Sequence, residues 1–161
     1  MIKQVIAFAD GENLSIRYKE MLKMGNLPKD DIINGPDCFV WSPRLTTWTY
    51  QDVIRFSYYT SIIGDDKRVA EVSDIIARTR YTCRDKDYYG EAKLIPRVHK
   101  KQSTSQKTKI VDVELTMDVM RAVLQMPIDA VYILSGDGDY LDLVKEIEKT
   151  TNKQVYIGAF S

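Results

Sequence analysis

The chain begins with an apolar segment that runs into an acid, Lys3-Gln4-Val5-Ile6-Ala7-Phe8-Ala9-Asp10-Gly11-Glu12-Asn13. A short apolar run followed by a glycine is typical of a buried strand that turns sharply into a helix. Asn13 then lies at the helix start, where its amide can hold a neighbouring carboxylate or a bound water. Helix capping by Asp10 or Asn13 explains the same residues and is slightly favoured for this motif taken alone.

Strand and helix patterns alternate along the rest of the chain. Strands are predicted at 3–9, 53–60, 93–98, 131–134 and 153–157, and helices at 12–24, 65–80, 112–125 and 139–149. This alternation predicts an α/β fold with a mainly parallel sheet covered by helices on both faces. We expect one domain over residues 1–161. Residues 26–51 stay unassigned, although 38–41 are expected as a short strand or a buried loop.

Composition excludes several classes of protein. The 161 residues are 44% hydrophobic and 29% charged, as in soluble globular proteins. No apolar run reaches the roughly 20 residues of a membrane helix, and the N-terminus does not resemble a signal peptide. His99 is the single histidine, which excludes a Cys/His zinc site and most histidine-based catalysis. Cys38 and Cys83 are expected as reduced thiols of a cytoplasmic protein, with one disulfide as the alternative.

The net charge is zero, but the charge is unevenly distributed. Residues 78–109 carry +7, between −2 for residues 1–77 and −5 for residues 110–161. The basic middle can attract a phosphate backbone. A solvated, lysine-rich loop explains the same charges equally well.

A second acidic segment follows the predicted strand at 131–134, as Ser135-Gly136-Asp137-Gly138-Asp139-Tyr140. Helix capping requires only one of its two carboxylates. Two close carboxylates repel one another unless a proton or a cation lies between them. Mg²⁺ and Mn²⁺ prefer such oxygen ligands. The spacing of the acids excludes a calcium-binding EF-hand loop.

A third segment, Lys109-Ile110-Val111-Asp112-Val113, leads into a helix that also contains Asp118. Asp112 is placed to cap the helix or to bind a ligand, and Asp118 is offset from it around the helix axis. Lys109 can neutralise a carboxylate or contact a phosphate. In parallel sheets, ligands bind beyond the carboxyl ends of the strands, so the three acidic segments are expected to meet there. Carboxylates that hold a metal can hydrolyse a phosphodiester without histidine.

The three motifs together resemble the NYN domain, the LabA-like branch of the PIN-like nuclease superfamily. The matching residues are D-G-x-N at 10–13, K-x-V-D-V at 109–113 with Asp118, and S-G-D-x-D-[FY] at 135–140. Gly138 stands where many relatives have serine. The sequence ends at Ser161, directly after the last predicted strand, where similar domains often continue into a further helix.

The resemblance implies a three-layer, Rossmann-like fold whose five strands have the order 3-2-1-4-5. It also implies RNA cleavage that depends on Mg²⁺ or Mn²⁺. The metal-binding and catalytic acids would be Asp10, Asp112, Asp137 and Asp139. The supporting residues would be Asn13, Asp118, Lys109 and Ser135.

The principal prediction is therefore a metal-dependent ribonuclease that acts on RNA, preferably single-stranded. The basic residues expected to bind RNA are Arg80, Arg84, Lys86, Arg97, Lys100, Lys101 and Lys107. The tyrosines available for base stacking are Tyr58, Tyr81, Tyr88 and Tyr89, with core packing favoured for Tyr58. A homo-oligomer through Trp41 and Trp48 is an open alternative, although at least one of them is expected in the core.

Two other functions are weighed against the ribonuclease. One is a catalytically silent RNA- or protein-binding regulatory module of the same fold. The other is a phosphatase or nucleotide hydrolase, which is less favoured. Glu12 stands where a dehalogenase-type phosphatase requires a second aspartate, and the chain has no GxxxxGK[ST] loop.

Overall fold

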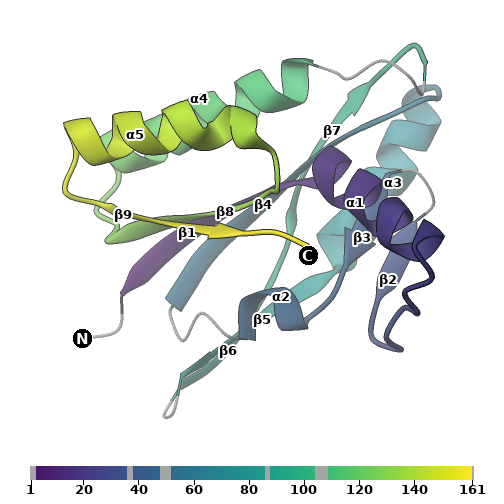
Figure 1. Cartoon of the computed structure of the whole chain (residues 1–161), viewed down its shortest axis with the longest axis horizontal. Coiled ribbons are helices and arrows are strands. Elements are labelled where there is room, and N and C mark those ends of the chain that lie inside the picture. The colour runs from purple at the N-terminus through teal and green to yellow at the C-terminus, as the bar shows by residue number, and fades with distance from the viewer. Residues whose placement is uncertain (1–2, 36–37, 48–51, 86–87, 104–108, 161) are drawn as a thin grey trace.

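The computed structural model describes residues 3–35, 38–47, 52–85, 88–103 and 109–160; of residues 44, 47, 83–85 and 88–90 it describes only the backbone. Figure 1 shows helices packed on both faces of a central sheet. The elements in chain order are β1 (Gln4–Asp10), α1 (Gly11–Lys23), β2 (Ile33–Gly35), β3 (Phe39–Trp41), α2 (Arg44–Thr47), β4 (Asp52–Ile62), α3 (Asp66–Arg78), β5 (Arg80–Asp85), β6 (Tyr88–Lys93), β7 (Ile95–Lys100), α4 (Lys109–Gln125), β8 (Ala130–Leu134), the 3-10 turn η1 (Gly138–Tyr140), α5 (Leu141–Thr150) and β9 (Gln154–Gly158).

The central sheet has five parallel strands in the order β7-β4-β1-β8-β9. Numbered by their place in the chain, these strands have the order 3-2-1-4-5, which confirms the predicted topology. The order reverses between β1 and β8, where Val5 pairs with Ala130 and Ala9 with Leu134. The residues that directly follow these two strands are therefore neighbours at one edge of the sheet.

The two faces of the sheet support two apolar cores. Val5, Ala7 and Ala9 of β1 pack on one face with side chains from α1, α3 and β3. Ile6 and Phe8 point to the other face and pack with α4 and α5, which Figure 1 shows side by side. Because successive side chains of a strand point to opposite faces, a strand buried on both sides is apolar throughout. This explains the continuous apolar run that precedes Asp10.

Trp41 and Tyr58 lie in the first of these cores, and neither is exposed. Their rings pack edge to face, with centroids 6.2 Å apart. Core packing of Tyr58 and of one tryptophan is therefore confirmed, and an interface through Trp41 is excluded by its burial. Trp48 lies outside the described residues.

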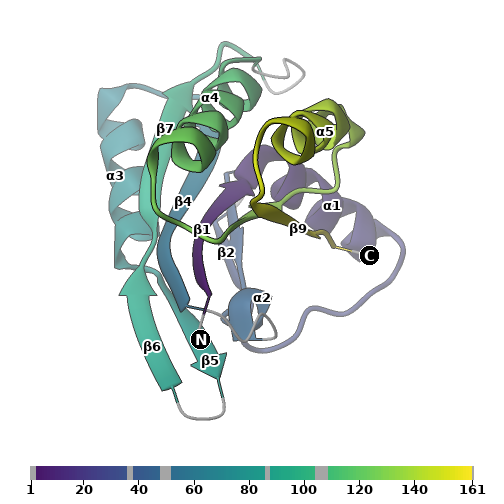
Figure 2. The same ribbon diagram turned by 90° about the vertical axis from the view of Figure 1, so that its left-hand side faces the viewer.

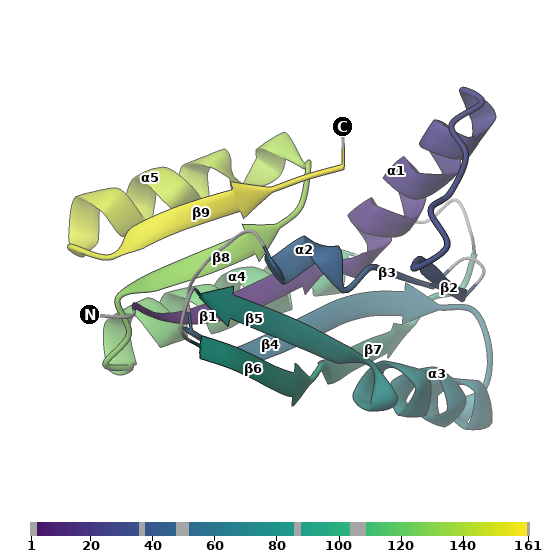
Figure 3. The same ribbon diagram turned by 90° about the horizontal axis from the view of Figure 1, so that it is seen from below.

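An antiparallel hairpin, β5–β6, occupies part of the region in which the sequence predicts only basic character. Tyr81 of β5 is buried and donates a hydrogen bond from its hydroxyl to the Val53 carbonyl oxygen, at 2.8 Å. Val53 is the second residue of β4, so the hairpin lies at the end of the sheet where the strands begin. Figure 2 shows the hairpin beyond that end, and Figure 3 shows it from below. The burial of Tyr81 excludes the predicted base-stacking role.

Some element boundaries differ from the sequence prediction. Helix α4 begins at Lys109, so this lysine is the first residue of the helix and does not precede it. The third strand of the sheet is shifted by two residues, to Ile95–Lys100. Cys38 is buried, and its Sγ lies 3.6 Å from the Gly35 carbonyl oxygen. Within the described ranges, no helix is both long enough and apolar enough to span a membrane.

Candidate active site

Asp10, the last residue of β1, is the centre of a buried polar cluster. Only 1% of the residue is exposed. Its Oδ1 accepts a hydrogen bond from the backbone nitrogen of Asn13 at 3.0 Å. Its Oδ2 accepts from the hydroxyls of Ser135 and Tyr140, at 3.1 Å and 3.2 Å. Residues from β1, the end of β8 and the 3-10 turn therefore meet at one carboxylate.

The Asp10 carboxyl has an unusual protonation equilibrium. Burial raises its pKa to about 6, and the nearby Asp112 acts in the same direction. The three hydrogen bonds to Asp10 lower the pKa but do not offset the burial. The metal-free protein therefore holds a proton on Asp10 more tightly than an exposed aspartate does.

Tyr140 connects Asp10 to a second acid. Its hydroxyl lies 3.2 Å from Asp10 Oδ2 and 3.2 Å from Asp112 Oδ1. A phenol has one proton and donates to one carboxylate at a time. The second oxygen–oxygen contact then requires a carboxyl proton or a nearby cation. Burial and the two carboxylates also raise the pKa of Tyr140, so it remains a hydrogen-bond donor.

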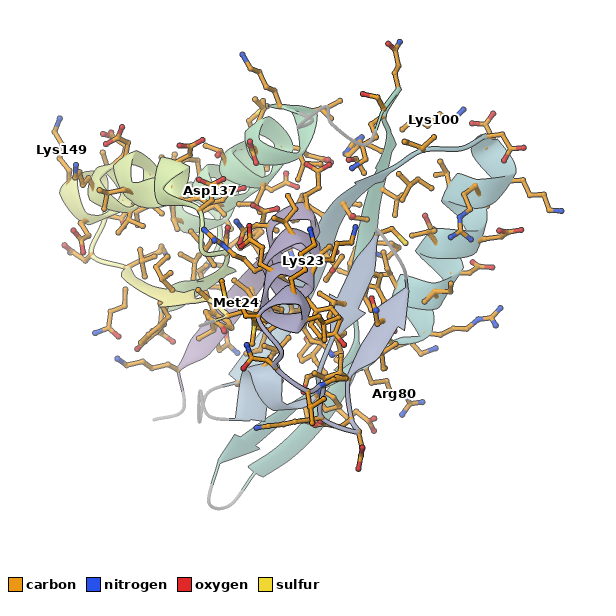
Figure 4. All side chains as sticks on the ribbon, turned by 45° about the vertical axis from the view of Figure 1, so that its right-hand side comes forward. Lys23, Met24, Arg80, Lys100, Asp137 and Lys149 are labelled. Carbon is orange, nitrogen blue, oxygen red and sulfur yellow. The ribbon has the colours of Figure 1, made fainter. Side chains whose placement is uncertain are left out.

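The turn after β8 is held by the residues predicted to support the site. Asn13 Oδ1 accepts a hydrogen bond from the Gly136 amide nitrogen at 2.8 Å. Ser135 Oγ accepts from the Asp137 amide nitrogen at 3.1 Å, and Asp137 Oδ1 accepts from the Asp139 amide nitrogen at 3.0 Å. Figure 4 places Asp137 between α1 and the layer formed by α4 and α5. Asp137 is half-buried and Asp139 is exposed.

The structure thus brings the four predicted acids to one edge of the sheet, where they form two separate pairs. Asp10 and Asp112 share Tyr140, whereas Asp137 and Asp139 belong to the turn that Ser135 and Asn13 hold. Among the residues that the structure describes, no three acidic, histidine or cysteine side chains already stand close enough to hold a metal ion. The donors are nevertheless oxygen atoms, and carboxylates suit Mg²⁺ and Mn²⁺. The shared Tyr140 contact also shows where a positive charge would relieve repulsion.

Asp118 makes its contacts outside this cluster. Its Oδ2 accepts a hydrogen bond from the Tyr59 hydroxyl at 2.7 Å, and its Oδ1 forms an ion pair with Arg121 at 2.5 Å. Asp118 lies six positions after Asp112, a rotation of about 600° around the helix, so the two side chains leave α4 in different directions. Asp118 is thus bonded to Tyr59, which is the β4 residue paired in register with Asp10.

Two residues of the site were missed by the sequence analysis. Tyr140 was noted as the last position of its motif, but its hydroxyl was not assigned a contact. Glu12 was treated as the variable position of its motif. The structure buries Glu12, where its Oε1 accepts a hydrogen bond from Ser61 and lies 3.4 Å from Lys101 Nζ. An acid in the first helical turn next to Asp10 was the available signal.

The predicted RNA-binding residues whose side chains the structure describes do not form one surface. Lys101 is directed inward and pairs with Glu12, with 14% of its side chain exposed. Arg80 pairs with Glu91 at 3.0 Å in the hairpin, and Lys100 pairs with Asp66. Figure 4 shows Arg80 and Lys100 far apart. The basic middle of the sequence is divided because β5–β6 and β7 lead to opposite ends of the sheet.

The other basic residues predicted to contact RNA differ in their positions. Arg97 is exposed on β7, and Lys109 is exposed at the start of the helix that contains Asp112. The side chain of Arg84 lies outside the described part of the chain, as do residues Lys86 and Lys107. Their predicted contacts with RNA stay predictions. The side chains of Tyr88 and Tyr89 are likewise outside the described part.

Comparisons with known proteins agree with this arrangement. The fold is similar to the crystal structure of a protein of unknown function, VPA0982 from Vibrio parahaemolyticus RIMD 2210633, with a TM-score of 0.57 and 16% sequence identity over 98% of this chain and 82% of that chain. No curated protein matches the sequence. The NYN domain family matches residues 4–161. The chain therefore belongs to the NYN domain family, which is part of the PIN-like nuclease superfamily.

Proposed function

We propose that this protein is a metal-dependent ribonuclease that hydrolyses phosphodiester bonds in RNA. Membership of the NYN family supports a nuclease. The observation that carries the proposal is the pair Asp10 and Asp112, which share the single hydroxyl of Tyr140 at the switch point of the sheet. Asp10 is buried and Asp112 is half-buried, and two carboxylates held this closely repel one another, which a bound cation would relieve.

The metal would be Mg²⁺ or Mn²⁺, held by Asp10, Asp112, Asp137 and Asp139. When bound, it supplies a water of lowered pKa and stabilises charge on the scissile phosphate. Ser135 and Tyr140 orient Oδ2 of Asp10, and Asn13 fixes both Asp10 and the turn that carries Asp137. Lys109 is exposed on the helix of Asp112 and is placed to meet a phosphate. This chain thus supplies the oriented oxygens and the turn that holds them.

The direct test is the cleavage of end-labelled single-stranded RNA with Mg²⁺ or Mn²⁺, with and without EDTA. We expect wild type to cut only with metal and Asp137→Asn to be at least about tenfold slower. Asp142→Asn is the matched control, because the Asp142 side chain is 93% exposed one turn further on. Cutting that survives EDTA, or that is equal in Asp137→Asn and wild type, would contradict the proposal.

Removal of the Tyr140 hydroxyl should slow cleavage without unfolding the protein. In Tyr140→Phe, Asp10 and Asp112 lose a common hydrogen-bond donor, but the ring still fills its place in the core. Groups that orient metal ligands typically contribute about 10- to 100-fold to activity or metal affinity. We expect a loss of this size in RNA cleavage, with an unchanged circular dichroism spectrum. A rate equal to that of wild type would show that the bridge has no role in positioning the acids.

A catalytically silent module of the same fold is the second candidate. It is favoured by one observation, that no three acids in the described ranges stand close enough to bind a metal as they are arranged. Under that alternative, RNA or protein binding persists while no RNA is cut with any metal. A cytoplasmic location and a homo-oligomer stay predictions.

A further inference from the structure

A cavity with several polar side chains lies between strands β4 and β7 and helix α4. Its volume is about 190 Å³. Ser57 and Tyr59 form part of its floor, and Asp118 and Gln125 lie on its helical side. Three arginines from three different elements also line it: Arg55 of β4, Arg97 of β7 and Arg121 of α4. Neither the family motifs nor the acid cluster accounts for this convergence of cations.

The cavity has an excess of positive charge. Three arginines face one acid, Asp118, so the formal charge of the lining is +2. Asp118 already interacts with Arg121 at 2.5 Å and with the Tyr59 hydroxyl at 2.7 Å. It is therefore committed to one of the three guanidinium groups. The lining holds no second acid for the other two groups among the described residues, so they are available to an anion.

Arg55 and Arg97 retain unused hydrogen-bond donors. The Nε of Arg55 is buried without a hydrogen-bond partner among the described residues, and its NH2 reaches only the Met126 sulfur, at 3.4 Å. The Arg97 guanidinium makes no hydrogen bond or ion pair with any other residue that the structure describes. A buried, unpaired N–H of a charged group is unfavourable, because its lost hydration is not replaced. The site is thus built for an acceptor that carries negative charge.

We propose that this arginine cavity binds a phosphate group of the RNA substrate. Guanidinium groups match the tetrahedral oxygens of phosphate with paired, charge-assisted hydrogen bonds. The volume equals about six waters of about 30 Å³ each, which is enough for a phosphate group. The inference rests on the proposed ribonuclease function for the identity of the substrate, and the phosphate chemistry follows from the cavity itself.

The position of the cavity suits contact with a second phosphate of the same RNA molecule. Asp10 pairs in register with Tyr59 of β4, and Tyr59 pairs with Arg97 of β7. Neighbouring strands lie about 4.8 Å apart, so the backbone of Arg97 is about 10 Å from that of Asp10. A chain whose scissile phosphate lies at Asp10 can therefore place another phosphate, a few nucleotides away, in the cavity.

The test is RNA binding by Arg97→Ala in EDTA, where no metal-dependent cleavage occurs. Fluorescence anisotropy with a labelled 12-nucleotide RNA is measured over a range of salt concentrations. We expect Arg97→Ala to bind about tenfold more weakly and the slope of log K against log salt to fall by about 0.7. The matched control is Arg78→Ala, which removes the same charge from an exposed pair with Asp74 on α3. The control should keep the slope of wild type.

Comparison of RNA with a 5′-phosphate and with a 5′-hydroxyl identifies which phosphate is bound. A loss only for the phosphorylated RNA assigns the cavity to the end of the chain; a loss for both assigns it to the backbone. Equal binding by Arg97→Ala and Arg78→Ala overturns the proposal. These measurements require no turnover, so a protein that binds RNA without cutting it would contradict the ribonuclease function alone.

Inorganic phosphate gives a second readout that requires no RNA. Titrated into the metal-free protein, it should shift the Nε–Hε NMR signals of Arg55 and Arg97, but not that of Arg78. The shifts should be lost from Arg55 in Arg97→Ala if both groups share one anion. Unchanged signals of Arg55 and Arg97 in the wild-type protein would also overturn the proposal.

Discussion

Replacing Asp10 by asparagine should lower the rate of RNA cleavage by about a hundred- to a thousandfold and, at the same time, stabilise the metal-free protein. The catalytic loss is expected because Asp10 is the buried acid on which Asn13, Ser135 and Tyr140 converge. Loss of one well-placed electrostatic group has effects of this size in other enzymes. The gain in stability is expected because asparagine removes a buried charge and keeps the shape of the side chain.

The pH dependence of stability follows from the raised pKa of Asp10. Burial, assisted by Asp112, raises this pKa from 3.8 to about 6 in the folded protein. Between these two values the folded protein holds a proton that the unfolded chain has lost, so the free energy of unfolding falls as pH rises. The contribution of Asp10 alone makes the free energy of unfolding lower above pH 6 than below pH 4, by on the order of 3 kcal/mol. Asp10→Asn removes this dependence.

Urea unfolding at pH 4.5 and at pH 8, in EDTA, measures this contribution. Asp10→Asn should exceed wild type in stability at pH 8, and the difference should shrink at pH 4.5. Added Mn²⁺ should then stabilise wild type and leave the variant unchanged, because a ligand stabilises only the state that binds it. A variant that is less stable than wild type at pH 8, or that gains equally from Mn²⁺, would show that Asp10 is not a strained metal ligand.

Gly11→Ala should destabilise the fold by about 3 kcal/mol or more. A Cβ at this position would lie 2.2 Å from Cε1 of Tyr58 and 2.6 Å from the carbonyl oxygen of Tyr59. Tyr58 is fully buried and cannot move aside without disturbing the core, and the second contact is with backbone. Overpacking of this kind distorts the structure or forces helix α1 away from β4. Thermal unfolding and RNA cleavage should both reveal the change.

Gly138→Ala is the matched control for this substitution. It adds the same methyl group in the turn that follows Asp137, but nothing lies within 4 Å of the new Cβ. Its stability should stay within about 0.5 kcal/mol of wild type. The open space also admits the serine that many relatives have at this position. Equal destabilisation by the two alanines would mean that the close approach of α1 to β4 is not what requires Gly11.

The sheet and its acidic edge were predictable because their signals are local. The apolar strands, the glycines and the acids that follow them lie within a few residues of one another, as in Asp10-Gly11 and Ser135–Asp139. The known rule for ligands at parallel sheets then connects segments that are far apart in sequence. The strand order implied by the resemblance made the ends of the first and fourth strands neighbours, and in the structure Ser135, which follows the fourth strand, donates a hydrogen bond of 3.1 Å to Asp10.

The contacts of the basic and aromatic residues were not predictable in the same way. Lys101 and Arg80 both lie in the basic middle of the sequence, yet one is directed to buried Glu12 and the other to Glu91 in the hairpin. Such pairings depend on which distant acid the fold brings near. Tyr81 shows the same difficulty, because its burial depends on the path of a hairpin that has no strong turn signal in the sequence. Over the described residues, a count of charges along the chain therefore overstated the continuity of the predicted RNA-binding surface.

The pairing of β1 with β8 also determines when the candidate active site can assemble during synthesis of the chain. Val5 and its partner Ala130 are separated by 125 residues. At about 5–20 residues per second, a ribosome needs roughly 6–25 s to make that intervening chain. During this time the first strand has no β8 beside it, and Asp10 lacks both Ser135 and Tyr140. A growing chain therefore lacks the assembled candidate site until β8 and the following turn have emerged.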